Sequence, residues 1–109
     1  MIEVKIYVGM SDKHSMAQTL DDDTYISVLK RVCQHYHVSF SFTLSNGGHF
    51  MDDGEYVEEQ SLILSLIDVD ESTLDEIAKD LCVFFNQESV LITKNAIHSY
   101  YVREGLPDI

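Results

Sequence analysis

The segment from residue 38 to residue 67 constrains the fold most, because two strand-like stretches there flank a turn and no helix separates them. The first stretch alternates Val38, Phe40, Phe42 and Leu44 with Ser and Thr. Asp52-Asp53-Gly54 is a turn signal, and an almost continuously apolar run, residues 62–67, follows it. We expect a long antiparallel hairpin that turns at Asp53-Gly54, with a bulge where Asn46-Gly47-Gly48 interrupts the alternation.

Two stretches with helical spacing flank this hairpin. Asp21-Asp22-Asp23-Thr24 opens the first, where carboxylates can cap free N–H groups and favour the positive end of the helix dipole. The second begins with a capping box that runs from Thr73 to Glu76. The apolar stripes are Tyr25, Val28, Leu29, Val32, Cys33 and Tyr36 in the first helix, and Leu74, Ile77, Ala78, Leu81, Cys82 and Phe85 in the second.

Strands complete the pattern at both ends of the chain. Ile2, Val4, Ile6 and Val8 alternate with polar residues, and two C-terminal strands, residues 89–94 and 96–102, meet at Lys94-Asn95. The order β-α-β-β-α-β-β predicts an α+β fold, a ferredoxin-like split βαβ sandwich whose mostly antiparallel sheet carries two helices on one face. We expect a single domain over residues 1–109 with a frayed tail at 104–109. A doubly wound parallel sheet is the weaker alternative, because the hairpin has no crossover helix.

The charge of the chain limits its partners. Nineteen Asp and Glu oppose seven Lys and Arg, which gives −12, and no Lys or Arg occurs from Val32 to Ala78. Such a chain repels phosphate backbones and anionic lipid, so we expect neither direct nucleic-acid binding nor membrane binding. A basic protein partner fits better, although solubility alone also explains the charge. We find no signal peptide and no run of about 20 apolar residues, and we expect a cytoplasmic protein.

The acidic residues of the hairpin and of the following connection are the leading site. We expect a partner-binding surface made of Asp52, Asp53, Glu55, Glu58, Glu59, Asp68, Asp70 and Glu71. The ordinary alternative is a solvated face with acidic residues at a helix start. The first functional hypothesis is a non-enzymatic protein that acts stoichiometrically on a basic macromolecule, for example as an inhibitor from a phage or mobile element.

The loop from Gly9 to Gln18 supports a second hypothesis. It is long, polar and without periodicity, and ordered loops of this kind often bind ligands. A small molecule would then bind under this loop or at a dimer interface. The candidate residues are Tyr7, Met10, Asp12, Lys13, His14 and Gln18. An exposed connector is the equally acceptable alternative.

Catalytic and metal-binding patterns are weak in this sequence. The serines stand in no GxSxG elbow, and the glycines form no phosphate loop, so we expect no enzyme and no cofactor. His35 and His37, with Cys33 or His49 as a third ligand, lack metal-site spacing, so we expect no metal. Cys33 and Cys82 occupy apolar helix positions and should be free, buried thiols.

The second face of the sheet predicts self-association. The first two strands place Glu3, Lys5, Tyr7, Ser39, Ser41 and Thr43 on that face. The strand from Leu62 to Ile67, however, is apolar on both sides, and Tyr100-Tyr101 lies near the end of the sheet. A second subunit would cover the extra apolar side chains, so we expect a homodimer.

Three short motifs resemble those of small uncharacterised bacterial and phage proteins. They are Tyr7-Val8-Gly9-Met10-Ser11-Asp12-Lys13, the return of the hairpin from Gly54 to Glu59, and Phe85-Asn86-Gln87-Glu88-Ser89-Val90. The resemblance extends over most of the chain. It implies the ferredoxin-like βαββαβ core and carries no assigned chemistry.

Overall fold

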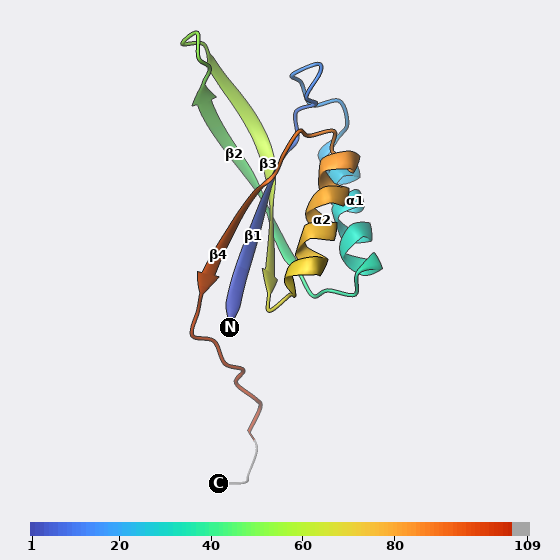
Figure 1. The fold of residues 1–109 in the computed structure, drawn as a ribbon, viewed down its shortest axis with the longest axis vertical. Coiled ribbons are helices and arrows are strands. Elements are labelled where there is room, and N and C mark those ends of the chain that lie inside the picture. Colours follow the sequence, from blue (N-terminus) through green and yellow to red (C-terminus); the bar gives the residue numbers. More distant parts are fainter. Residues whose placement is uncertain (106–109) are drawn as a thin grey trace.

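A computed structural model describes residues 1–105, with the side chain of His49 excepted. The elements are β1 (Ile2–Gly9), α1 (Asp22–His35), β2 (Ser41–Phe50), β3 (Tyr56–Ile67), α2 (Glu71–Phe84) and β4 (Leu91–Ala96). The sheet order is β2-β3-β1-β4 with antiparallel neighbours, and both helices lie on one face of the sheet (Figure 1). The predicted ferredoxin-like α+β fold is therefore confirmed, and the parallel alternative is excluded. Of the expected frayed tail, residues 106–109 lie outside the described residues.

The core lies between the sheet and the helices. Val4, Ile6 and Val8 alternate inward on β1 and stand opposite Leu66, Leu64 and Leu62 of β3. All six side chains are at most 1% exposed. The helices cover them with the apolar stripes expected from the sequence: Tyr25, Leu29, Val32 and Cys33 of α1, and Leu74, Ile77, Ala78, Leu81 and Phe85 of the second stripe, are buried. Cys82 is only half-buried.

Aspartates begin both helices. The Asp21 carboxylate accepts a hydrogen bond from Thr24 N at 2.9 Å, as the acidic start of the first stripe predicts. Asp70 caps α2 in the same way and accepts from Thr73 N at 3.2 Å. The predicted capping box from Thr73 to Glu76 was therefore wrong. The helix α2 already begins at Glu71, because the Asp70 carboxylate accepts the hydrogen bond of the free Thr73 N–H.

The hairpin continues regularly through Asn46-Gly47-Gly48, so the predicted bulge was wrong. These residues pair in register with Gln60, Glu59 and Glu58. The Gly48 position has another explanation: a Cβ atom there would collide with the Tyr56 ring. Glycine thus makes room for an aromatic side chain without breaking the ladder. The turn itself falls at residues 52–54, as expected, and Gly54 adopts φ 86°.

The C-terminal pair of strands was wrong. One strand, Leu91–Ala96, runs through the expected turn at Lys94-Asn95, and residues 97–105 form no strand. The backbone of Ile97 still donates to Met1 O at 2.9 Å, and after it the chain leaves the sheet (Figure 1). A strand forms only where a neighbouring strand pairs with its backbone N–H and C=O groups, so the alternating pattern alone does not make this segment a strand.

The sheet face opposite the helices is open. Ile63 is half-buried there and Ile67 is 47% exposed, so the described residues 1–105 leave the second side of this strand largely uncovered. The alternation of Phe40, Phe42 and Leu44 with polar residues predicts a core position for Phe42, but Phe42 is only half-buried against the core, because β2 is an outer strand. No helix within residues 1–105 combines the length and the apolar character needed to cross a membrane.

Candidate functional site

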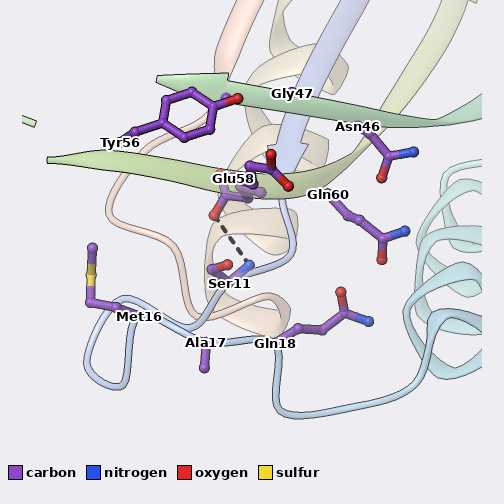
Figure 2. A pocket seen from close by; sticks show the side chains of 11 residues that line it. Ser11, Met16, Ala17, Gln18, Asn46, Gly47, Tyr56, Glu58 and Gln60 are labelled. Atoms are coloured by element: carbon purple, nitrogen blue, oxygen red, sulfur yellow. Dashed lines mark hydrogen bonds between the residues drawn. The ribbon is translucent and has the colours of Figure 1, made fainter. Parts of the chain in front are cut away.

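A cleft of about 670 Å³ separates the loop after β1 from the extended part of the hairpin. Figure 2 shows Gln18 of the loop and Asn46 and Gln60 of the hairpin extending into this space. The loop contributes Ser11, Met16, Ala17 and Gln18, and the hairpin contributes Asn46, Gly47, Gly48, Tyr56, Glu58, Glu59 and Gln60. Its volume lies in the range of small-molecule sites, about 300–1,000 Å³.

The loop is anchored at its start. Met10 is fully buried in the core, and its N–H donates to Gln60 O at 3.0 Å. This bond extends the pairing of β1 with β3 by one residue and fixes the start of the loop to the hairpin. Further along, the loop closes on itself, because Asp12 N donates to Ala17 O at 2.8 Å. The loop wall of the cleft is therefore an ordered element.

Asp12 holds the loop together and ties it to the end of α2. One carboxylate oxygen accepts from His14 N at 2.8 Å and from Ser15 N at 3.0 Å, and the other accepts from the Asn86 amide. Lys13 N returns a hydrogen bond to Asn86 O at 3.2 Å. The Asn86 amide, aided by the two backbone donors, lowers the pKa of Asp12 to about 2. Asp12 is therefore a charged, structural residue at neutral pH.

Glu59 occupies the space above Gly9. Its Oε2 accepts from Ser11 N at 3.3 Å, the dashed line in Figure 2. A Cβ atom on Gly9 would lie 2.8 Å from Glu59 Oε1 and 3.1 Å from Gln87 Oε1. Gln87 in turn donates to Ser11 O. The glycine that ends the first strand in the sequence thus leaves room for a carboxylate at the edge of the cleft.

The three motifs that resemble the phage and bacterial proteins come together here. The first supplies Gly9, Ser11 and Asp12, the second Glu59, and the third Asn86 and Gln87. They are separated by up to 76 residues along the chain. The convergence places all three motifs around one end of the sheet.

The lining suits a cation that also carries hydrogen-bonding groups. Glu58 and Glu59 supply negative charge, while Gln18, Asn46 and Gln60 supply amides that both donate and accept. Tyr56 adds an aromatic ring and Met16 a polarisable thioether. Among the lining side chains that the structure describes, none is Lys, Arg or His. A ligand of net negative charge, such as a nucleotide phosphate, would find no side chain of opposite charge among these residues.

The structure distributes the predicted loop residues over different roles. Gln18 lines the cleft, whereas Met10 is core and Asp12 braces the loop. Tyr7 points to the open face of the sheet, opposite Leu91 and Ile63. Lys13 and His14 are exposed and lie outside the lining. Five residues of this site were not predicted from the sequence: Ser11, Tyr56, Gln60, Asn86 and Gln87. For Asn86 and Gln87 a signal was available, because they form a polar run directly after the second apolar stripe.

The predicted acidic residues fall into two groups at opposite ends of β3. Asp52, Asp53 and Glu55 lie at the tip of the hairpin with Glu58 and Glu59 just behind it, whereas Asp68, Asp70 and Glu71 follow the other end of the strand. Even Glu59, the member of the first group nearest to the second, is separated from Asp68 by most of β3, roughly 30 Å along the strand.

The second group also has structural roles. Asp68 accepts from Ile2 N at 2.8 Å, Asp70 caps α2 and Glu71 pairs with Lys94. The hydrogen bond and charge of Lys94 lower the pKa of Glu71. Within residues 1–105, no three His, Cys, Asp or Glu side chains come close enough to hold a metal ion.

No known protein family matches the sequence, and no curated protein matches it either. Solved structures share the fold. A phage SAM lyase in complex with S-methyl-5'-thioadenosine matches with a TM-score of 0.63 and 19% identity, over 86% of this chain and 79% of that one. CutA from Pyrococcus horikoshii, in 3 M guanidine hydrochloride, gives 0.58 and 12%, over 93% and 88%. The GlnK–ATP complex of B. subtilis gives 0.52 and 13%, over 87% and 84%.

Proposed function

We propose that this protein binds S-adenosylmethionine (SAM) in the cleft between the loop and the hairpin, and cleaves it there. One observation carries the proposal: two carboxylates, Glu58 and Glu59, line the cleft with no described basic side chain beside them. SAM is a sulfonium cation, so its charge matches this lining. The proposal departs from the expectation of a non-enzymatic protein. It builds on the alternative hypothesis, a small molecule bound under the loop, and adds a catalytic activity.

The other groups of the cleft fit the rest of such a ligand. The adenine and ribose need donors and acceptors, which the amides of Gln18, Asn46 and Gln60 can provide. Tyr56 offers a ring face against which a base can stack. The cleft volume of about 670 Å³ is large enough for a nucleoside of this size.

The phage SAM lyase suggests the reaction. In the proposed reaction, a carboxylate oxygen of the methionine part attacks the γ-carbon of the same molecule and closes a lactone, while the bond from that carbon to sulfur breaks and leaves its electron pair on sulfur. S-methyl-5'-thioadenosine leaves as a neutral thioether. A carboxylate near sulfur stabilises charged SAM more than the neutral product, so Glu59 serves binding and favours product release. Positioning of the reacting atoms supplies the acceleration.

Titration calorimetry with SAM, S-adenosylhomocysteine and S-methyl-5'-thioadenosine tests the binding. We expect SAM to bind at least about tenfold more tightly than the two neutral thioethers. Glu59→Gln should remove this preference, whereas Glu55→Gln, an equally conservative change at the exposed hairpin tip, should keep it. Equal affinity for all three compounds would contradict the proposal.

Chromatography of SAM incubated with the protein tests the cleavage. S-methyl-5'-thioadenosine should accumulate with the wild-type protein and with Glu55→Gln, and more slowly with Glu59→Gln. Retention of intact SAM would leave the binding proposal standing and remove the lyase.

The exposed acidic tip supports a second candidate, binding of a basic protein. The hairpin extends well beyond the helices (Figure 1), and its tip carries exposed Asp52, Asp53 and Glu55. Phe50 packs against Tyr56 beside them with ring centroids 5.3 Å apart and remains 74% exposed. A hairpin tip that carries only negative charge, with an exposed aromatic side chain beside it, suits electrostatic steering of a basic partner.

The second candidate has its own test. Asp52, Asp53 and Glu55 are changed together to Lys, which leaves the cleft residues intact, and proteins captured from a lysate are compared at low and high salt. We expect a salt-sensitive basic protein with the wild type and its loss with the variant. Changing Asp75 and Glu76 of α2 to Lys is the control. If the tip variant captures the same proteins as the wild type, the negative charge of the tip serves solubility alone.

A further inference from the structure

The open face of the sheet is almost neutral although the chain carries −12. The residues on this face, where the sheet has four strands, are Glu3, Lys5, Tyr7, Ser41, Thr43, Ser61, Ile63, Ser65, Ile67, Leu91, Thr93 and Asn95. Only Glu3 and Lys5 carry charge, and the charges cancel. The outer strand β2 contains no Asp, Glu, Lys or Arg, and the one charged residue of β4, Lys94, pairs with Glu71 on the helix side of the sheet. Edge strands of sheets that stay unpaired are usually protected by charge.

Apolar side chains are exposed on this face. Leu91 is 62% exposed at the β4 end of a cross-strand row with Tyr7 and Ile63, and Ile67 is 47% exposed at the end of β3. A row of this kind is typical of a sheet that packs on a second layer.

The C-terminal segment extends the same surface. Tyr101, at 87%, and Val102, at 85%, are the most exposed large apolar side chains of residues 1–105, and Tyr100 is 74% exposed. Tyr101 lines a hollow with Glu3, Ser41, Ser65 and Ile67 of the open face, so the segment is continuous with that face. The alternation of residues 96–102 predicts a strand, yet residues 97–105 form none, and beyond Ile97 no backbone hydrogen bond ties the segment to the rest of residues 1–105.

We propose that a second copy of this chain docks on the open face of the sheet and on residues 97–102. Electrostatics selects this occupant. Two chains of −12 repel one another at their acidic surfaces, and the neutral open face is where copies can meet without that repulsion. A basic partner would instead favour the acidic hairpin tip. The docked copy covers Ile63, Ile67 and Leu91 and gives the C-terminal segment a partner for its backbone.

Sedimentation equilibrium of the full chain from about 1 to 100 μM tests the proposal. We expect a mass of at least twice the 12.5 kDa of one chain at the upper concentrations. Leu91→Asp should weaken self-association at least about tenfold, because it places a charge in the apolar row that the docked copy would cover. Phe84→Asp is the matched control: Phe84 is 58% exposed, close to the 62% of Leu91, but belongs to α2 on the other side of the sheet, and its variant should associate like the wild type.

Two further measurements keep the test decisive. Tyr101→Asp lies outside the core, so it should weaken association without affecting the fold, which circular dichroism verifies for each variant. Amide hydrogen exchange of residues 97–102 should slow as the concentration rises. A monomer throughout the concentration range, or equal dissociation by Phe84→Asp and Leu91→Asp, would overturn the proposal.

Discussion

The Asp12 carboxylate accepts a hydrogen bond from the Asn86 side chain, which is 74 residues away in the sequence. This contact joins the loop after β1 to the end of α2, and it fixes one wall of the cleft. Because the charged carboxylate accepts this hydrogen bond, the lowered pKa of Asp12 sets the pH below which the contact weakens.

The first prediction concerns this pKa. Because the folded pKa of Asp12, about 2, lies below its ordinary value of 3.8, the contribution of this carboxylate to stability is complete above pH 3.8 and is lost as the pH falls through about 2. NMR titration should show this carboxyl protonating near 2. Asn86→Gly removes the amide donor and suits the φ of 51° at this position, so it should move the midpoint toward 3.8. An unchanged midpoint would mean that Asn86 does not stabilise the charged form.

The second prediction concerns the partners Phe42 and Leu64, which stand opposite one another on β2 and β3. Full burial of Phe42 would predict a loss of about 3–5 kcal/mol for Phe42→Ala. Phe42 is half-buried, with Lys30 Nζ 5.9 Å from its ring centre, so we expect about 1–2 kcal/mol. Leu64→Ala at 0% exposure should cost about 2–5 kcal/mol. Urea unfolding measures both, and a larger loss at Phe42 than at Leu64 would contradict this assignment of the core.

The third prediction concerns the cysteines. Burial raises the pKa of the Cys33 thiol to about 11 from 9.0, which leaves very little thiolate at pH 8. Iodoacetamide should therefore modify Cys33 at least about a hundredfold more slowly in the folded protein than in urea. Half-buried Cys82 should react first. Mass spectrometry of Cys33→Ser and Cys82→Ser isolates each rate, and rapid labelling of folded Cys82→Ser would show that Cys33 is accessible.

The fourth prediction concerns the start of α2. Asp70 accepts hydrogen bonds from Thr73 N at 3.2 Å and from the hydroxyls of Ser72 and Thr73. Asp70→Ala should lower Tm by about 4 °C or more, because the first turn loses its cap. Asp75→Ala, a change of the same type at an exposed position within α2, should have a smaller effect. Thermal unfolding followed by circular dichroism compares the two variants.

Local patterns explain why much of the fold was predictable. Alternation at Val4, Ile6 and Val8 and helical spacing at Leu29, Val32 and Cys33 each follow from the period of one element, so the sequence reveals which side is buried. The turn at Gly54 is equally local. The bulge at Gly47-Gly48 was wrong because the reason for Gly48 is the Tyr56 ring on the neighbouring strand.

The sequence by itself determined the order of the elements, their buried sides and a strongly acidic surface, because these depend on residues that are close along the chain. Only the tertiary structure decided the site. The cleft exists because Ser11 meets Glu59 and Gln87 meets Ser11 across intervals of 48 and 76 residues. It also decided that the two acidic groups lie at opposite ends of β3 and that residues 98–102 form no strand within the part of the chain that the structure describes. Pairing and proximity depend on which segments the fold brings together, and no periodicity within a single segment encodes that.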